Sequence, residues 1–214
     1  MSSLTRMALG AMGKLRPRPV YQPGESSIVL PPFEKHGGLP LLDAFSQRRS
    51  GRDFASMPLP LPMLSQLLWS AWGVNRKGGH RTAPTAMDCQ EIDLYVALPT
   101  GAYLYDAAAH ALHLAVHSDV RRVTGYQDFV DHAPLDLVFV ADQSRMGLVP
   151  VQQRESYALV AAGAIAQNVY LFAASAGLST VLRAWIDRGA LAEALQLSHD
   201  QQVLLSQTVG FPAA

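Results

Sequence analysis

The chain has 214 residues, of which 49% are hydrophobic and only 16% are charged, against about 25% charged residues in typical soluble domains. Its 17 basic and 17 acidic residues balance, which excludes a nucleic-acid or anionic-membrane binder whose affinity rests on net positive charge. The single cysteine, Cys89, excludes an intramolecular disulfide and a multi-cysteine metal site. One globular domain is expected at this length, with a large core or a partner that covers part of its surface.

Residues 1–40 are rich in proline, glycine and serine, which predicts an extended N-terminal arm rather than regular structure. Residues 41–214 form the predicted globular domain. The arm contains a short apolar stretch, Met7 to Met12, flanked by basic residues. This stretch is too short for a secretory signal or a membrane span, so we expect a cytoplasmic protein that does not bind a membrane.

Two helices are predicted after the arm. Apolar residues from Leu41 to Phe45 begin the first, which ends at a basic cluster, Gln47 to Phe54. The second covers Met63 to Trp72, because its apolar residues recur on one face and Gly73 follows as a stop signal. The polar, glycine-containing residues 75–86 predict a long loop, and long loops inside compact domains are often functional.

The middle of the chain predicts strands. Residues 92–98, 102–105 and 111–116 are separated by turns, and the first alternates apolar and polar positions, which indicates antiparallel pairing. Residues 121–130 are typical of short helices. The near-continuous apolar run 135–141 predicts a central strand.

The longest periodic segment, Glu155 to Ala176, predicts a helix that is buried on nearly every face, because apolar residues surround it. Its many small residues allow another helix to approach closely, either within the domain or across a dimer. Gly177 ends this helix. A strand at 179–183, a short helix at 191–197 and a last strand at 202–209 complete the prediction.

The basic cluster carries Arg48, Arg49 and Arg52 around Ser50. A guanidinium presents a planar fork of donors that fits a phosphate, and a hydroxyl at a helix end adds a neutral donor beside it. This pattern indicates an anion clamp. The alternative is a solvated basic patch at the end of a surface helix, which composition alone favours.

Other chemistries find little support in the sequence. His110, His113 and His117 lie close together, but strand alternation places His110 on the opposite face from the other two, so no metal site is expected. The chain lacks the Gly-x-Ser-x-Gly elbow of serine hydrolases and the glycine patterns of Rossmann and P-loop nucleotide sites. The arginine cluster and the loop at 81–86 remain as the candidate site.

Several motifs follow one another in a characteristic order along the chain: Arg48-Arg49-Ser50-Gly51-Arg52-Asp53-Phe54, Leu64-Ser65-Gln66-Leu67-Leu68-Trp69, Arg81-Thr82-Ala83-Pro84-Thr85-Ala86, Ala161-Ala162-Gly163-Ala164-Ile165-Ala166-Gln167-Asn168 and Val209-Gly210-Phe211-Pro212. In this order they resemble the FMN-dependent nitroreductase family over residues 41–212. Within that family, the resemblance is to a short branch related to the dehydrogenases that oxidise azolines in peptide natural products.

The resemblance implies an α+β fold of three layers, α-β-α, with a mixed, largely antiparallel sheet. It also implies a homodimer with FMN at the interface, which would account for the low charged fraction, since obligate dimers bury large apolar areas. Arg48 would then hold the FMN phosphate, Ser50 the phosphate or the ribityl chain, and Arg49 the ribityl or phosphate region. Arg52 would lie at the N1/C2 carbonyl edge of the flavin.

The resemblance also assigns contacts outside the cluster. Gln127 matches an amide that reads the pyrimidine edge of the flavin, and the backbone of Arg183 and Ala184 matches a turn that donates to flavin N5. A loop from the partner subunit would contribute the remaining contacts, at Pro84, Thr85, Ala86 and Asp88.

The implied function is transfer of a hydride from NAD(P)H through FMN to a small electron-poor acceptor, such as a nitroaromatic or a quinone, by a ping-pong mechanism. No catalytic acid or base is assigned, because the flavin carries the chemistry. Azoline oxidation is not expected, since the Lys-Tyr pair of those relatives is absent. Thr85, Ala86 and Asp88 stand where the family usually has Ser-Ser and Asn. A flavin-binding homodimer with little or no turnover is therefore an alternative, and a structural helical protein with a solvated basic patch is a third.

Overall fold

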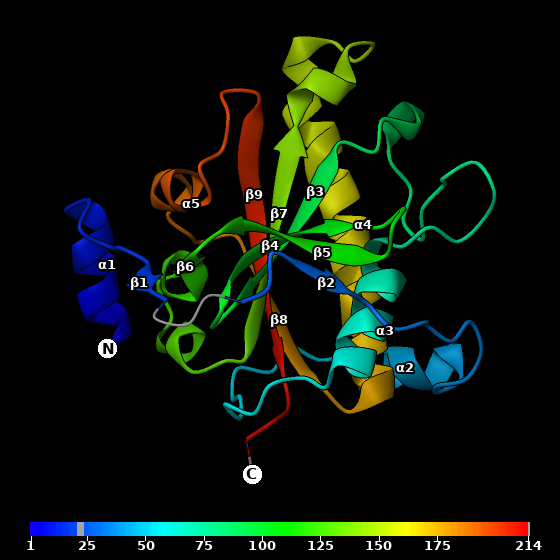
Figure 1. Cartoon of the computed structure of the whole chain (residues 1–214), viewed down its shortest axis with the longest axis horizontal. Helices are drawn as coiled ribbons and strands as arrows, with labels where there is room; N and C mark the ends of the chain where they lie inside the picture. The colour runs from blue at the N-terminus through cyan, green and yellow to red at the C-terminus, as the bar shows by residue number, and fades with distance from the viewer. Residues whose placement is uncertain (21–23, 214) are drawn as a thin grey trace.

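A computed structural model describes residues 1–20 and 24–213, so residues 21–23 of the predicted arm and Ala214 of the predicted domain lie outside the described residues. A seven-stranded sheet in the order β2-β5-β4-β3-β7-β9-β8 runs through the middle of the molecule, and β1 pairs with β6 beside it (Figure 1). The strands are β1 (Arg18–Pro19), β2 (Ser27–Val29), β3 (Ile92–Leu98), β4 (Gly101–Asp106), β5 (Ala111–Val116), β6 (Ser118–Asp119), β7 (Leu135–Asp142), β8 (Ser179–Arg183) and β9 (Gln201–Gly210).

Every strand pair among the described residues is antiparallel. The prediction of a largely antiparallel sheet is therefore confirmed, but its mixed character is not found in this part of the chain. Strands β3, β4 and β5 follow one another as a meander joined by short turns, and short turns can connect only antiparallel neighbours.

Helices cover both faces of the sheet, which confirms the three-layer α+β fold. In Figure 1, α2 (Leu41–Gln47), α3 (Leu61–Trp72) and α4 (Val151–Ala176) lie on one side of the sheet, and α1 (Ser3–Ala11) and α5 (Arg188–Leu195) lie on the other. Short 3-10 helices complete the inventory: η1 (Ala86–Asp88), η2 (Val120–Val123), η3 (Asp128–Asp131) and η4 (Gln143–Met146).

Successive side chains of β3 point into two different hydrophobic cores, one on each face of the sheet. Leu94 and Val96 belong to the larger core, under α3 and α4, whereas Tyr95 and Ala97 belong to the smaller core, with α5 and η2. Successive side chains of a strand point to opposite faces, so one strand supplies both layers. Strand β7 is buried along nearly its whole length between β3 and β9, as predicted for a central strand.

Helix α4 differs from its prediction. It begins at Val151, and within one chain only one side is buried: Ala158, Ala162 and Ile165 are buried, while Val160 is 74% exposed. The prediction that α4 is buried on nearly every face was therefore wrong for the single chain, because α4 packs on α3 and the sheet from one side only. The helix is long and apolar enough to cross a membrane by length and composition, properties that core helices share, and 44% of its most apolar window is buried within the protein.

The N-terminal prediction also needs correction. Residues 3–11 form a regular helix, capped by the Ser2 side chain, which accepts a hydrogen bond from the Thr5 N–H. Arg6 of this helix is fully buried and pairs with Asp131 of η3. Strand β2 further pairs with β5. The extended-arm prediction was wrong for these segments, because partners that are distant in the sequence supply contacts that local composition does not reveal.

Candidate functional site

The basic cluster leaves the C-terminal end of α2 and runs against β8. Arg48 caps α2, and its backbone N–H donates to Ala44 O at 2.9 Å. The Gly51 N–H donates to Thr180 O at 3.0 Å, and a Cβ atom at position 51 would collide with the Ser179 hydroxyl. A side chain at position 51 would therefore require the Ser179 hydroxyl to move, and the backbone hydrogen bond holds the cluster against the sheet at Gly51.

A cavity of about 900 Å³ adjoins the cluster, within the size range of small-molecule sites. The structure brings four predicted residues to its wall, Arg48, Arg49, Ser50 and Arg52. The opposite side is formed by the C-terminal end of α4 and the start of β8, with Tyr170, Gly177 and Ser179, and by Pro212 and Ala213 near the end of the chain.

The cavity is electropositive. Among the described residues, no carboxylate lies within ion-pair distance of Arg48, Arg49 or Arg52, although Asp53 also lines the cavity. By contrast, Arg18, Arg121 and Arg145 all have acidic partners elsewhere in the protein. Guanidinium groups that converge on one cavity without internal neutralisation attract an anion.

Tyr170 of α4 joins this cluster, and sequence reasoning missed it. Its hydroxyl lies 2.9 Å from Ser50 Oγ and accepts a hydrogen bond from the Leu182 N–H at 2.9 Å. The Arg48 guanidinium lies over the tyrosine ring, 5.3 Å from its centroid. A phenol in the apolar stretch that follows Gln167 and Asn168 was the available signal, since a buried Tyr hydroxyl needs a polar partner.

Arg183 has a structural side chain. It is 5% exposed, pairs with Asp136 and donates to Thr124 O at 2.9 Å and to Thr208 Oγ1 at 2.7 Å. Burial lowers the pKa of Arg183, against the opposing influence of Asp136. The guanidinium is thus committed to the interior, and only the backbone at Arg183 and Ala184 remains for a ligand.

Gln127 lies near Arg183. A Cβ atom at Gly125 would collide with the Arg183 guanidinium and come within 2.7 Å of Gln127 Oε1, so both side chains approach the same backbone position. Gln127 Oε1 is buried and has no hydrogen-bond partner among the described residues. A buried amide oxygen without a donor is an acceptor that a ligand N–H can satisfy. Like Arg183 and Ala184, however, Gln127 is not among the residues that line the cavity beside the arginine cluster.

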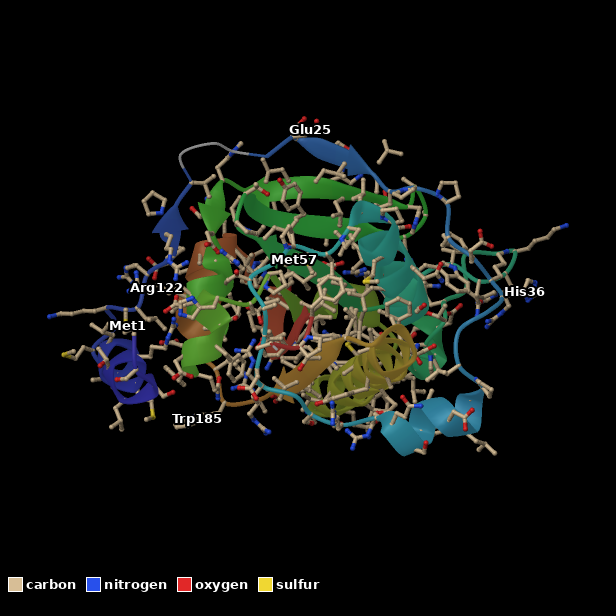
Figure 2. All side chains as sticks on the ribbon, turned by 90° about the horizontal axis from the view of Figure 1, so that it is seen from below. Met1, Glu25, His36, Met57, Arg122 and Trp185 are labelled. Carbon is tan, nitrogen blue, oxygen red and sulfur yellow. The ribbon has the colours of Figure 1, made fainter. Side chains whose placement is uncertain are left out.

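A second, smaller cavity of about 480 Å³ shares Arg52, Asp53 and Ala213 with the first. The aromatic rings of Phe54 and Phe129 line it, with ring centroids 5.4 Å apart. Met1, Ser2, Asp128 and His132 also line this cavity. Figure 2 shows Met1 and Arg122 at the same end of the molecule, in agreement with the 3.8 Å contact between Arg122 Nη2 and Met1 Sδ. The N-terminal segment therefore borders the candidate site.

The loop that carries Pro84, Thr85, Ala86 and Asp88 lies elsewhere in the chain. None of these residues lines either cavity, so one chain does not bring them to the arginine cluster. The loop has an unusual backbone, with positive φ angles of 55° at Met87 and 53° at Asp88. Asp88 Oδ2 lies 2.9 Å from His80 Nδ1, so the carboxylate has a histidine as its partner.

The described residues contain no group of three or more potential metal ligands. His110 lies in the turn before β5 rather than in the strand, so the prediction of its side-chain direction from strand alternation does not apply. Its ring contacts Ser65 Oγ at 2.7 Å and Tyr105 Oη at 3.0 Å. Burial lowers the pKa of His110, which favours the neutral ring.

Glu91 is a second feature that sequence reasoning missed. It precedes β3 and is 0% exposed, and neither carboxyl oxygen has a hydrogen-bond partner among the described residues. Burial raises the pKa of Glu91, outweighing the opposing influences of its own backbone N–H and of Arg145. Glu91 lines neither cavity, so it is a feature of stability rather than of the site.

Comparison with known proteins identifies relatives of the whole fold. The sequence model of the nitroreductase family matches residues 45–211. A Methanocaldococcus jannaschii protein that bears the name "Putative nitroreductase" is 32% identical over 164 residues, which cover 72% of this chain and 81% of the relative.

Solved structures agree with the sequence comparison. The crystal structure of a Ralstonia eutropha protein titled a "putative nitroreductase" has a TM-score of 0.90 and 50% identity, covering 94% of this chain and 96% of the other. A chain of the Escherichia coli microcin synthetase McbBCD complex has a TM-score of 0.71 at 19% identity, covering 86% of this chain and 77% of the other. At that identity the microcin synthetase chain shows a shared fold alone.

Proposed function

The chain belongs to the nitroreductase family, and we propose that it is an FMN-dependent oxidoreductase that transfers a hydride from NAD(P)H to a small electron-poor acceptor. Family membership supports flavin-dependent oxidoreduction in general. A nitroaromatic or a quinone is the acceptor class, and NAD(P)H and the acceptor occupy one site in turn, in ping-pong order.

The observation that carries this proposal is the convergence of Arg48, Arg49 and Arg52 on one cavity of about 900 Å³, without acidic partners among the described residues. A phosphate monoester supplies the negative charge that these guanidinium groups lack. Arg48 and Ser50 hold the phosphate, and Arg49 contacts the phosphate or the ribityl chain. Bidentate, charge-assisted hydrogen bonds of this kind are among the strongest in proteins.

The ring of the flavin has a separate set of contacts. Gln127 offers a buried acceptor without a partner, which fits the imide N–H of the pyrimidine edge. Arg183 is the last residue of β8 and Ala184 follows it, and the Arg183 side chain is turned into the interior, away from a ligand at this backbone. Arg52 places a positive charge at the N1/C2 carbonyl edge, where negative charge gathers on reduction.

Bound FMN supplies the hydride chemistry, and the protein supplies binding, orientation and electrostatics. The chain's own residues therefore carry no proposed catalytic acid or base. Phe54 and Phe129 line the smaller cavity that shares Arg52. Their rings provide an apolar wall for a flat acceptor and restrict water at that side of the site.

The functional unit is a homodimer in this proposal. Exposed apolar side chains on α2 and α4 include Leu42, Phe45 and Val160, which are 79%, 50% and 74% exposed. Pairing of two chains would cover such residues. The partner copy would bring Pro84, Thr85, Ala86 and Asp88 to the flavin, since these residues do not reach the cluster within one chain.

An absorbance spectrum of the purified protein tests the cofactor. Flavin bands that are released as FMN on denaturation, together with anaerobic bleaching by NADH or NADPH, are the expected result. A protein that stays colourless after addition of FMN contradicts the proposal. Steady-state rates with a nitroaromatic and a quinone at varied NAD(P)H then test the ping-pong order, for which parallel double-reciprocal lines are expected.

A flavin-binding homodimer without appreciable turnover is the second candidate. The observation that favours it is the acidic side chain of Asp88 in the loop that is assigned to the flavin edge. This side chain is 52% exposed. A negative charge there opposes electron uptake by a neighbouring ring. Flavin that binds but is not bleached by either nicotinamide under anaerobic conditions would establish this candidate over the first.

A further inference from the structure

Tyr170 lies where three elements meet. It belongs to α4, its hydroxyl contacts Ser50 in the segment after α2, and the same hydroxyl accepts from Leu182 of β8. We infer that Tyr170 is the positioning residue of the anion clamp formed by Arg48, Arg49, Ser50 and Arg52: its hydroxyl directs the Ser50 proton to the phosphate, and its ring holds Arg48. This inference rests on the proposed function and adds a residue to the same site.

The first step concerns the direction of the protons. The Leu182 N–H donates to Tyr170 Oη at 2.9 Å, and Ser50 Oγ lies 2.9 Å from the same oxygen. A phenol has a single proton to donate. Either hydroxyl could donate across this distance; in the inferred arrangement the phenol oxygen accepts from the backbone and donates to Ser50 Oγ, so the Ser50 proton is available to another acceptor.

The second step concerns what that acceptor is. Ser50 lines the electropositive cavity together with Arg48 and Arg52. The Leu182 N–H, the Tyr170 O–H and the Ser50 O–H thus form a series of donors that runs from β8 into the cavity. Each hydrogen bond in such a series polarises the next, and the last one is strongest when its acceptor carries a negative charge. The relay therefore favours a phosphate over a neutral hydroxyl group.

The third step concerns Arg48. Its guanidinium lies 5.3 Å from the centroid of the Tyr170 ring, a distance at which a cation is attracted to the ring face. The ring holds the guanidinium without neutralising it, unlike a carboxylate. One side chain therefore orients both residues that are assigned to the phosphate, Arg48 through its ring and Ser50 through its hydroxyl.

The test compares two flavins that differ only in the phosphate. Tyr170→Phe removes the hydroxyl and keeps the ring, so it interrupts the relay and leaves the contact with Arg48. Flavin-free full-length protein is titrated with FMN and with riboflavin, and binding is followed by the change in flavin fluorescence. We expect the Kd for FMN to rise by about tenfold, as for loss of a hydrogen bond to a charged group, and the Kd for riboflavin to stay within about twofold.

Three further variants keep the test decisive. Tyr157→Phe removes the other tyrosine hydroxyl of α4, outside the cavity, and is expected to leave both Kd values unchanged. Ser50→Ala removes the last member of the relay without altering Tyr170. The double variant Ser50→Ala with Tyr170→Phe is expected to bind FMN no more weakly than Ser50→Ala alone, because the relay has already lost its end.

The other outcomes overturn the inference. Equal weakening of FMN and riboflavin by Tyr170→Phe indicates that the hydroxyl only supports β8. Independent effects that multiply in the double variant show that no relay exists. An unchanged Kd for FMN in Tyr170→Phe overturns this inference and leaves the proposed function standing, whereas a parent protein that binds neither flavin overturns both.

Discussion

At the scale of single residues, the arginines of this protein fall into two groups: those that are paired with acidic residues inside the fold, and those beside the cavity that have no acidic partner among the described residues. Arg6 and Arg183 are buried and paired with Asp131 and Asp136. Arg48 has a ring rather than a carboxylate as its neighbour. A buried pair holds the fold together, while an arginine without an acidic partner beside a cavity is available for a ligand.

Arg48→Ala is expected to weaken FMN binding by about tenfold to a hundredfold, because a charge-assisted contact with the phosphate is lost. The free energy of unfolding should change little, because Arg48 has no ion pair to break. Fluorescence titration measures the Kd and urea denaturation measures the stability. Arg16→Ala is the matched control: Arg16 is 58% exposed and pairs at the surface with Glu193, and its loss should leave FMN binding unchanged.

Glu91→Gln is expected to stabilise the protein at neutral pH. Burial raises the pKa of Glu91 in the folded chain, so folding favours the protonated form and stability falls as pH rises above about 4.3, the ordinary value of the unfolded side chain. The difference in the free energy of unfolding between the variant and the parent should grow by up to about 1.4 kcal/mol per pH unit, until the pH reaches the pKa of Glu91 in the folded chain.

Urea denaturation at pH 4 and pH 7 measures this effect. The parent and the variant should have similar stability at pH 4, where Glu91 is mostly protonated in both the folded and the unfolded chain, and should diverge at pH 7. Glu25→Gln, at an exposed position, provides the control and should show no pH-dependent gain. If Glu91→Gln is no more stable than the parent at pH 7, this result would contradict the view that Glu91 is a buried carboxyl without a partner.

Sequence alone revealed the cluster but not its surroundings. Arg48, Ser50 and Arg52 are adjacent in the chain, so their density is visible as a local pattern. Tyr170 and Glu91 acquire their significance from segments that are distant in sequence: Tyr170 from Ser50, and Glu91 from a burial that no local pattern predicts. A single chain also leaves the assignment of Thr85, Ala86 and Asp88 to a partner as a prediction.

At the scale of elements, the apolar patterns of the sequence predicted strands and helices reliably where the pattern extended over many residues. Strands β3, β7 and β9 and helix α3 appear within a few residues of their predicted bounds, because each buries a regular apolar face. Helix α1 was missed because its attachment does not rest on a buried apolar face: Arg6 is its only buried residue and pairs with Asp131. Its Ser2 cap was a signal that the surrounding prolines and glycines obscured.

Asp131→Asn is expected to release α1. The carboxylate pairs with Arg6 and Arg18, and removal of one member of a buried pair costs about 3–5 kcal/mol because the remaining charge is left unpaired. Limited proteolysis with trypsin should cleave the variant rapidly after Arg6 and Lys14, neither of which precedes a proline. Asp43→Asn, at an exposed position in α2, should leave the cleavage rate of the parent unchanged.

The pH dependence of this attachment has a defined sign. Burial would raise the pKa of Asp131, but the hydrogen bond and charge of Arg6, with Arg18 and Arg122, outweigh it and hold the pKa below its usual value. A depressed carboxyl pKa contributes stability that is fully present above about 3.9 and is lost as pH falls through the folded value. The parent should therefore keep α1 protected at pH 5 and lose that protection only in stronger acid.

At the scale of the whole molecule, the single chain leaves a large apolar area uncovered. Leu148, Val151 and Val160, at and before α4, are 82%, 67% and 74% exposed. Only 16% of the residues are charged, so few charged side chains are available to make such a surface compatible with water. A second copy of the chain is the occupant that the proposed function requires.

Val160→Glu is expected to dissociate the proposed homodimer, because a carboxylate at an apolar interface must be desolvated without a partner. Analytical ultracentrifugation should give a dimer for the parent and a monomer for the variant, with loss of bound flavin on dissociation. Leu4→Glu introduces the same change at a 76% exposed position in α1 and should remain dimeric. A parent that sediments as a monomer with flavin bound would rule out the interfacial site.

The pairing of Arg6 and Arg18 with the 118–131 region has a consequence for the order of folding. Their hydrogen bonds to Arg122 and Asp131 span 116 and 113 residues of chain. Contacts of such long sequence separation carry a large loop-closure cost and form after local contacts. During synthesis, Arg6 and Arg18 must therefore wait until residues 122–131 have been made, so helix α1 docks late, after more local contacts have formed.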